Sequence, residues 1–242
     1  RCRSYHILGE GCDGVSAEFV CVPVTNILAK PKRLSFPEAS ASLLAFLTAW
    51  HMLVDRVRIK PGETVLVHAG ASGVGSAAIQ IANLHGARVF ATAGTDEKVA
   101  LCKRLGAEEA VNYRDVEFHR EVRNWAGRAG VDAVFEHVGA ATWENSLRCL
   151  SWGGRLVTCG ATSGHEVTMD LRKLFFKGWS ILGSSMGSRG ELATLLEHVE
   201  RGTLSPVIDR ILPFSRVSEA HELIEQRELV GKVVLTWEDT HE

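Results

Sequence analysis

The segment Thr64–Gly75 reads TVLVHAGASGVG and joins a short β-branched run to a glycine-rich turn. Behind the turn, apolar residues recur at helical spacing up to Gly86, at Val74, Ala77, Ala78, Ile81 and Ala82. Glycine allows a backbone to approach a pyrophosphate closely, and a helix N-terminus presents unpaired N–H groups and a positive dipole end. The segment therefore predicts a loop that binds the phosphates of a dinucleotide. Its spacing is G-x-x-G-x-G instead of the usual G-x-G-x-x-G, and a plain tight strand-to-helix turn is the alternative.

Five further apolar runs follow the first at regular intervals, with helical patterns between them. They are Arg88–Thr92, Glu109–Asn112, Val131–Glu136, Gly154–Cys159 and Trp179–Ser184. Continuous apolar strands that alternate with helices are typical of a parallel sheet covered on both faces. Six strands fit two βαβαβ halves, so the pattern predicts an α/β fold with a doubly wound, parallel, six-stranded Rossmann sheet.

The two ends of the chain have a different pattern. Residues 1–40 are interrupted by glycine and proline, and contain a short extended piece at Ala17–Val24. The last part holds helical patterns at Glu191–Glu200 and Val217–Gln226, with the extended pieces VIDRILP and KVVLTW. Neither end has enough apolar periodicity for a domain of its own. We therefore expect a Rossmann domain over 46–185, with 1–45 and 186–242 as parts of one further domain.

Composition and charge narrow the class of protein. The 242 residues are 45% hydrophobic and 23% charged, which is ordinary globular composition, and the net charge is −2. This balance argues against a nucleic-acid partner or an anionic membrane surface, and no apolar stretch is long enough for a membrane span. Six cysteines are scattered with no C-x-x-C motif, which favours a soluble protein of the reducing cytoplasm.

The end of the second strand bears on the choice of dinucleotide. A carboxylate at that position would bind the ribose 2′-hydroxyl of NAD, but the strand ends at Ala93 and no acid precedes Asp96. Thr95 and Lys98 offer a hydroxyl and a cation for a 2′-phosphate. The pattern favours NADP(H). NAD(H) stays open, because Asp96 or Glu97 could reach a ribose and Thr95 could simply cap the next helix.

Three stretches together resemble one family. GETVLVHAGASGVGSAAIQIANLHGARVFATAGTDEK (Gly62–Lys98), GAEEAVNY (Gly106–Tyr113) and HVGAATWENSLRCLSWGGRLVTCG (His137–Gly160) resemble the medium-chain dehydrogenase/reductase superfamily. The branch is that of zinc-type alcohol dehydrogenases and quinone oxidoreductases. The head Cys2–Pro23 and the tail Leu204–Ile224 with GKVVL resemble that family's GroES-like catalytic domain, whose first part we expect to precede Arg1.

The resemblance implies an enzyme that transfers hydride between a nicotinamide cofactor and an alcohol, carbonyl, quinone or enone. The chain would carry mainly the cofactor-binding half, so its activity on its own stays open. Cofactor contacts carried over by position are Gly70, Ser72, Gly73 and Val74 at the pyrophosphate, Thr95, Lys98 and Tyr113 at the 2′-phosphate, and Thr48, Val138, Gly160 and Ala161 at the nicotinamide half.

The same comparison argues against zinc. Leu44 occupies the position of a catalytic cysteine ligand, and leucine cannot bind zinc. Cys2 resembles the last of four cysteines in the family's structural zinc lobe, and is at most a remnant of that site. Cys12 and Cys21 do not restore the family spacing. We therefore expect no zinc in this chain.

Candidates for direct catalysis are few. Thr48 and His51 are weak candidates, since an imidazole suits proton transfer near neutral pH. His68, within the first strand, and His137, after the fourth, are more often satisfied core histidines. A methyltransferase is disfavoured because the second strand lacks a terminal acid. A non-catalytic protein that binds NADPH for structure or sensing remains the alternative function.

The sixth run, Trp179–Ser184, bears on assembly. It is short, apolar and uncharged, and it falls at the edge of the predicted sheet, where an open strand favours pairing. In the family this strand pairs with its twin, which implies a homodimer or a tetramer. The alternative is an edge strand that the C-terminal helices cover.

Overall fold

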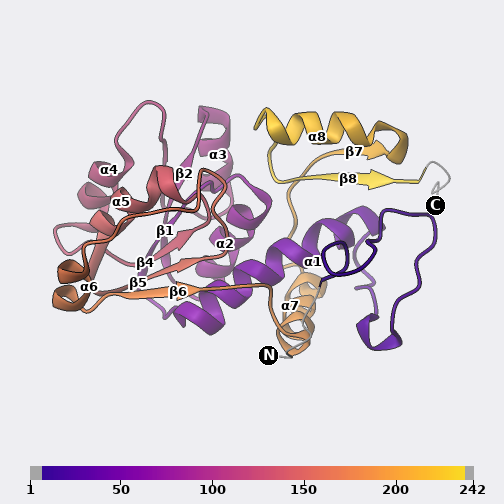
Figure 1. Ribbon diagram of the computed structural model, residues 1–242, viewed down its shortest axis with the longest axis horizontal. Coiled ribbons are helices and arrows are strands. Elements are labelled where there is room, and N and C mark those ends of the chain that lie inside the picture. The colour runs from indigo at the N-terminus through magenta and orange to yellow at the C-terminus, as the bar shows by residue number, and fades with distance from the viewer. Residues whose placement is uncertain (1–6, 238–242) are drawn as a thin grey trace.

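The centre of the molecule is a parallel sheet. The computed structural model describes residues 7–237, and its six-stranded sheet has the order β3-β2-β1-β4-β5-β6 (Figure 1). The strands are β1 Thr64–Val67, β2 Arg88–Ala93, β3 Glu109–Asn112, β4 Val131–Glu136, β5 Leu150–Thr158 and β6 Ser180–Gly183. The chain reverses its direction of travel across the sheet between β1 and β4, as in the doubly wound fold. The predicted Rossmann sheet is confirmed.

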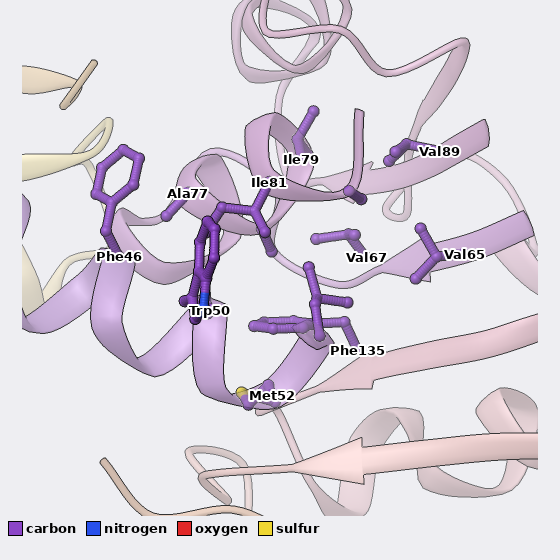
Figure 2. Close-up of a cluster of buried hydrophobic side chains, with 14 of the residues drawn as sticks. Phe46, Trp50, Met52, Val65, Val67, Ala77, Ile79, Ile81, Val89 and Phe135 are labelled. Carbon is purple, nitrogen blue, oxygen red and sulfur yellow. The ribbon is translucent and has the colours of Figure 1, made fainter. Parts of the chain in front are cut away.

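Helices cover both faces of this sheet. They are α2 Gly73–Leu84, α3 Asp96–Arg104, α4 Phe118–Ala126, α5 Ala140–Cys149 and α6 Leu171–Lys177, preceded by α1 Phe36–Trp50. Side chains alternate along each strand, so Val65, Val67 and Phe135 join the cluster under α1 and α2 (Figure 2). Leu66 and Phe90 join the cluster on the other face, where α4 and α5 contribute side chains. Burial on both faces explains why the strands read as continuous apolar runs.

Helix α1 connects the sheet to the rest of the molecule. Ser35 and Glu38 form a capping box at its start, which satisfies two backbone donors. At its other end α1 continues without a break into the π-helix η2 (His51–Val57), which ends at Arg58 with a left-handed φ of 56°. The helix thus runs across the domain boundary expected between residues 45 and 46.

The C-terminal part forms a second, smaller unit, drawn in orange and yellow in Figure 1. It contains α8 (Val217–Glu225), the 3₁₀ turn η3 (Phe214–Arg216), and the parallel pair β7 (Ile208–Pro213) and β8 (Lys232–Thr236). The helix before it, α7 (Arg189–Arg201), instead packs into the main core through Leu195 and Val199. Both predicted helices and both extended pieces are present.

The N-terminal expectation was wrong in one respect. Ala17–Val24 was predicted to be extended, but no strand forms there; residues 7–35 hold the 3₁₀ turn η1 (Val24–Asn26) and a single bridge between Leu8 and Cys12. Phe19 is 91% exposed, so this apolar run has no partner surface within the described chain. No helix among residues 7–237 has both the length and the hydropathy needed to cross a bilayer.

Candidate cofactor site

The predicted phosphate loop joins β1 to α2 in a tightly packed turn. Ser72 caps α2, and its hydroxyl accepts a hydrogen bond from Gly75 N at 3.0 Å. A Cβ on Gly75 would lie 2.2 Å from the Ala69 carbonyl oxygen, and one on Gly70 would lie 2.7 Å from Cys102 Sγ. The backbone therefore leaves no room for a side chain at Gly75, and packed side chains leave none at Gly70. The first-turn amides of Gly73 and Val74 cannot bond within the helix, so the donor set fits a pyrophosphate.

The C-terminal segment lies against this loop. Gly231 N donates to the Ala71 carbonyl at 2.7 Å, and residues 72 and 231 form a parallel bridge. A Cβ on Gly73 would lie 2.5 Å from Lys232 Cδ, so the aliphatic stem of this lysine covers the start of α2. Lys232 was not among the predicted site residues. Its place beside the loop depends on a contact between residues far apart in the sequence.

The residues predicted for the 2′-phosphate gather at the end of β2. Thr95 caps α3, and its hydroxyl accepts from Lys98 N at 3.3 Å. A Cβ on Gly94 would lie 2.9 Å from Tyr113 Oη, so this phenol lies across the turn after β2. The structure thus brings Thr95, Lys98 and Tyr113 to one corner of the sheet.

Lys98 is already in a restrained environment at that corner. Its Nζ donates to the Arg227 carbonyl at 2.7 Å, in the loop that leads to β8. Burial and the nearby Arg114 guanidinium lower the pKa of Lys98, while Asp209 and Glu228 oppose this shift. The repulsion from Arg114 means that a second cation stands close to the ammonium group.

A cavity of about 320 Å³ opens where β4, β5 and β6 end. Its lining includes the predicted residues Gly160 and Ala161 together with Gly139, Cys159 and Ser184. Val138 comes just before Gly139 in the turn after β4. In an open α/β sheet, ligands bind outside the carboxyl ends of the strands. The cavity lies at such ends, on the β4–β6 side of the switch point between β1 and β4.

Thr48 and His51 do not line that cavity. Thr48 is buried on α1, and its hydroxyl donates to the Leu44 carbonyl at 2.8 Å. His51 Nδ1 lies 2.8 Å from Oε1 of Glu191, the carboxylate that also completes the capping box of α7. This contact ties the end of α1 to the start of α7.

A buried polar network lies between the phosphate loop and the turn after β4. His68 stands just after β1 and not within it; its Nε2 lies 2.8 Å from Ser146 Oγ and its Nδ1 3.1 Å from Thr92 Oγ1. Ser146 and Thr142 donate to Glu136 Oε2 at 2.9 and 2.8 Å. Sequence reasoning missed Glu136, Ser146 and Thr92 entirely.

His137 is half-buried in the turn after β4 and connects β4 to the end of β1. Its Nε2 donates to the His68 carbonyl at 2.9 Å, and burial lowers its pKa. This is the satisfied core histidine that the sequence suggested as the more common outcome.

The described residues do not fit a zinc ion. Within 7–237 no group of three or more His, Cys, Asp or Glu side chains is placed to hold a metal. Leu44 is exposed on α1, and Cys12 and Cys21 are exposed free thiols. Cys2 lies outside the described residues.

Comparison with known proteins identifies the family. Residues 73–201 match the family model described as zinc-binding dehydrogenase. Human quinone oxidoreductase is 32% identical over 229 residues, which cover 92% of this chain and 69% of that protein. A crystal structure of an NAD-dependent alcohol dehydrogenase is 47% identical with a TM-score of 0.93, covering 97% of this chain and 68% of that one.

A third relative is the 2-octenoyl-CoA carboxylase reductase CinF, solved with NADP and 2-octenoyl-CoA. It is 29% identical with a TM-score of 0.83, covering 89% of this chain and 53% of that one. Sequence, fold and loop geometry agree, and the chain belongs to the zinc-binding dehydrogenase family of the medium-chain dehydrogenase/reductase superfamily.

Proposed function

We propose that this chain binds NADP(H) and forms the cofactor-binding part of an oxidoreductase. The observation that carries the proposal is the loop at Gly70–Gly75, where backbone packing excludes any side chain at Gly75 and the amides of Gly73 and Val74 have no acceptor within α2. The bound nicotinamide would supply the hydride. The residues of the chain bind the cofactor and orient it, which is the protein's share in such chemistry.

The substrate class we propose is a quinone or an enone, with other carbonyls and alcohols next. Leu44 stands where the family resemblance places a cysteine ligand of a catalytic zinc, and leucine cannot bind the metal that would polarise an alcohol or carbonyl oxygen. Polarisation by hydrogen-bond donors suits an activated double bond or a quinone. Human quinone oxidoreductase, the alcohol dehydrogenase and the CoA carboxylase reductase are all oxidoreductases by name, which supports the reaction class.

The preference for NADP(H) rests on the corner at the end of β2. No carboxylate follows Ala93 directly, and Lys98 lies close enough to Arg114 for the two charges to interact. A 2′-phosphate brings close to two negative charges, which two cations would stabilise. The relatives divide, since one is described as NAD-dependent and another holds NADP. The proposal therefore rests on local charge, with the cations Lys98 and Arg114 set against the carboxylates Asp209 and Glu228.

Substitution of Lys98 tests this preference. In Lys98→Ala we expect the Kd for NADPH to rise about tenfold or more, because a charge-assisted contact of roughly 1.5–3 kcal/mol is lost. The Kd for NADH should stay unchanged. Lys103→Ala is the matched control, since Lys103 is on the same helix and pairs with Glu109. Fluorescence titration with both cofactors measures all three proteins.

Two outcomes would contradict the proposal. Tighter binding of NADH than of NADPH by the unmodified chain would refute the NADP(H) preference, and no binding of either would refute the cofactor function. A panel of quinones and enones then separates an enzyme from a protein that only binds NADPH. Cofactor binding without oxidation in the presence of any acceptor favours the non-catalytic alternative for this chain.

We also propose a homodimer, or a tetramer built from it, through β6. Within 7–237, β6 pairs only with β5, so its outer edge is open (Figure 1). Beside that part of the sheet, Trp152, Leu171, Phe175 and Phe176 are each at least 66% exposed, and the rings of Trp152 and Phe176 are 5.3 Å apart. An open strand edge flanked by exposed apolar side chains is suited to pairing with a second copy.

The compartment we propose is the cytoplasm. The five described cysteines are all free thiols, and burial raises the pKa of Cys102 and Cys149 to about 12. Unpaired thiols that stay protonated are what a reducing compartment favours.

A further inference from the structure

Glu136 is a fully buried carboxylate with four hydrogen-bond donors. Its Oε1 accepts from the backbone amides of Val138 at 2.6 Å and Gly139 at 3.1 Å. Its Oε2 accepts from the hydroxyls of Thr142 and Ser146. Burial opposes ionisation, but hydrogen bonds from these donors favour the carboxylate, and the pKa of Glu136 is lowered. The side chain is therefore charged at neutral pH, and it fixes the backbone of the turn after β4.

The hydrogen-bond directions in this network follow from its charge. Ser146 has a single hydroxyl hydrogen, which it donates to the carboxylate, so its oxygen must accept from His68 Nε2–H. Burial lowers the pKa of His68 to about 4, so the ring is neutral and its Nδ1 accepts from Thr92. The Thr92 oxygen in turn accepts from Ala69 N at 3.3 Å. Every hydrogen bond in this chain is therefore donated in the same direction, from Ala69 through Thr92, His68 and Ser146 to Glu136.

The two ends of this relay lie in the two halves of the cofactor crevice. Ala69 begins the phosphate loop and has a left-handed φ of 46°, which an L-residue rarely adopts without support. Val138 and Gly139 form the turn beside the cavity where β4 and β5 end. His68 and Glu136 are at most 1% exposed, and Phe118 packs edge-on against the imidazole at 4.9 Å. Water therefore does not compete for these hydrogen bonds.

We propose that Thr92, His68, Ser146 and Glu136 are positioning residues that hold the phosphate loop and the nicotinamide turn in register, so that a dinucleotide can bind both halves at once. This rests on the proposed cofactor function. The relay does not touch the cofactor in this scheme. The relay acts through the backbone of Ala69 at one end and of Val138 and Gly139 at the other. Breaking the relay loosens the phosphate loop relative to the nicotinamide turn.

Ser146→Ala breaks the relay at its centre and leaves Glu136 with three donors, the two backbone amides and the Thr142 hydroxyl. We expect the Kd of the preferred reduced dinucleotide to rise about five- to tenfold, as expected for a lost hydrogen bond of roughly 1 kcal/mol. The Kd of ADP, which occupies only the phosphate half, should change by less than about twofold on the same reasoning. Thr142→Val is the matched control, because Thr142 is also on α5 and donates to the same carboxylate oxygen but lies off the relay.

The titration distinguishes failure of the proposed cofactor function from failure of the positioning role. If the unmodified chain binds no dinucleotide, the proposed function fails first. If it binds, and Ser146→Ala weakens ADP and the dinucleotide equally or weakens neither, the register role is refuted. An effect of Thr142→Val equal to that of Ser146→Ala would also refute it, because the direction of the relay would then be irrelevant.

A second variant tests the direction of the relay itself. In Glu136→Gln, the amide oxygen stays with the two backbone donors and the NH₂ group faces Ser146. The Ser146 hydroxyl must then donate to His68, and the ring proton moves from Nε2 to Nδ1. ¹⁵N NMR of the His68 ring distinguishes the two tautomers. We expect Nε2–H in the unmodified chain and Nδ1–H in the variant; the same tautomer in both would overturn the proposed relay.

Discussion

At the scale of single residues, the most demanding feature is a histidine held neutral beside a buried carboxylate. His68 is surrounded by Thr92, Ser146 and the ring of Phe118, and it is 3.8 Å from Glu136 Oε2. A proton added to His68 would be attracted by the carboxylate of Glu136, but it would also place a positive charge on a ring that no water reaches. Desolvation prevails, which is why the pKa of His68 falls from 6.5 to about 4.

This shift makes the stability of the fold depend on pH. Between pH 6.5 and about 4 the unfolded chain protonates His68 while the folded chain does not, so stability falls as the pH falls. From pH 7.5 to 5 this histidine should account for a loss of about 2 kcal/mol. His68→Gln removes that titration, so the stability gap between variant and unmodified chain should narrow over the same range.

Urea unfolding at the two pH values measures the gap. His137, whose pKa is also lowered, is present in both proteins and cancels in the comparison. A gap that stays constant or widens at pH 5 would show that His68 is not held neutral in the folded chain.

Single residues also mark how far the sequence could predict the site. Ser72 and Tyr113 were expected at the cofactor because their positions match the family's motif, and Lys98 because it also offers a cation near the end of the second strand. Ser146 and Lys232 gave no such signal, since their roles depend on contacts across the fold. For Thr48 and His51 the positions on a helix were correct, but only the packing of α1 on α7 shows where His51 points.

At the scale of elements, the start of α2 limits what the phosphate loop tolerates. In Gly75→Ala the new Cβ meets a backbone carbonyl 2.2 Å away and neither can move freely. We expect a loss of about 1–3 kcal/mol in stability, typical of overpacking, together with weaker binding of both NADPH and ADP. Thermal unfolding and the same titrations measure this.

Gly190→Ala is the matched control for that prediction. Gly190 is also in the first turn of a helix, α7, where the nearest atom to a new Cβ is Ser188 Oγ at 3.9 Å. Alanine should be neutral or slightly stabilising there. A Gly75→Ala protein as stable as Gly190→Ala would mean that the loop is not packed as described.

The elements that the sequence predicted well are those whose pattern is local. β3 and β4 match their predicted bounds. β4 is buried along almost its whole length and reads as an apolar run that stops at Glu136, while β3, at the sheet edge, is a short run between the polar residues Glu109 and Asn112. β5 begins at Leu150, four residues earlier than predicted, because the strand passes through Gly153 and Gly154 with a register shift, and a glycine pair in the sequence suggests an end. Ala17–Val24 has strand-like residues but no neighbouring strand, and propensity alone does not make a ladder.

At the scale of the whole molecule, the C-terminal segment completes the nucleotide site from outside the Rossmann sheet. Lys98 bonds to the Arg227 carbonyl, and Gly231 bonds to the Ala71 carbonyl. The segment before β8 is therefore fixed at two points, to the phosphate loop at Ala71 and to α3 at Lys98. No pattern in the segment itself indicates this, because it needs the sheet to be in place first.

The sheet also has a free end, and the last prediction concerns it. Ile181 is half-buried in β6, with its backbone paired to Leu156 of β5 on one side only. If two copies join through this edge, a lysine at 181 places two positive charges at the dimer interface, one from each copy. Burial of both charges there destabilises the dimer. Ile181→Lys should shift sedimentation from dimer or tetramer to monomer while far-UV circular dichroism stays the same. Ile211→Lys, at a 50% exposed strand position far from β6 in the chain, is the control and should leave the assembly intact. An unmodified chain that sediments as a monomer at micromolar concentration would refute the dimer without any variant.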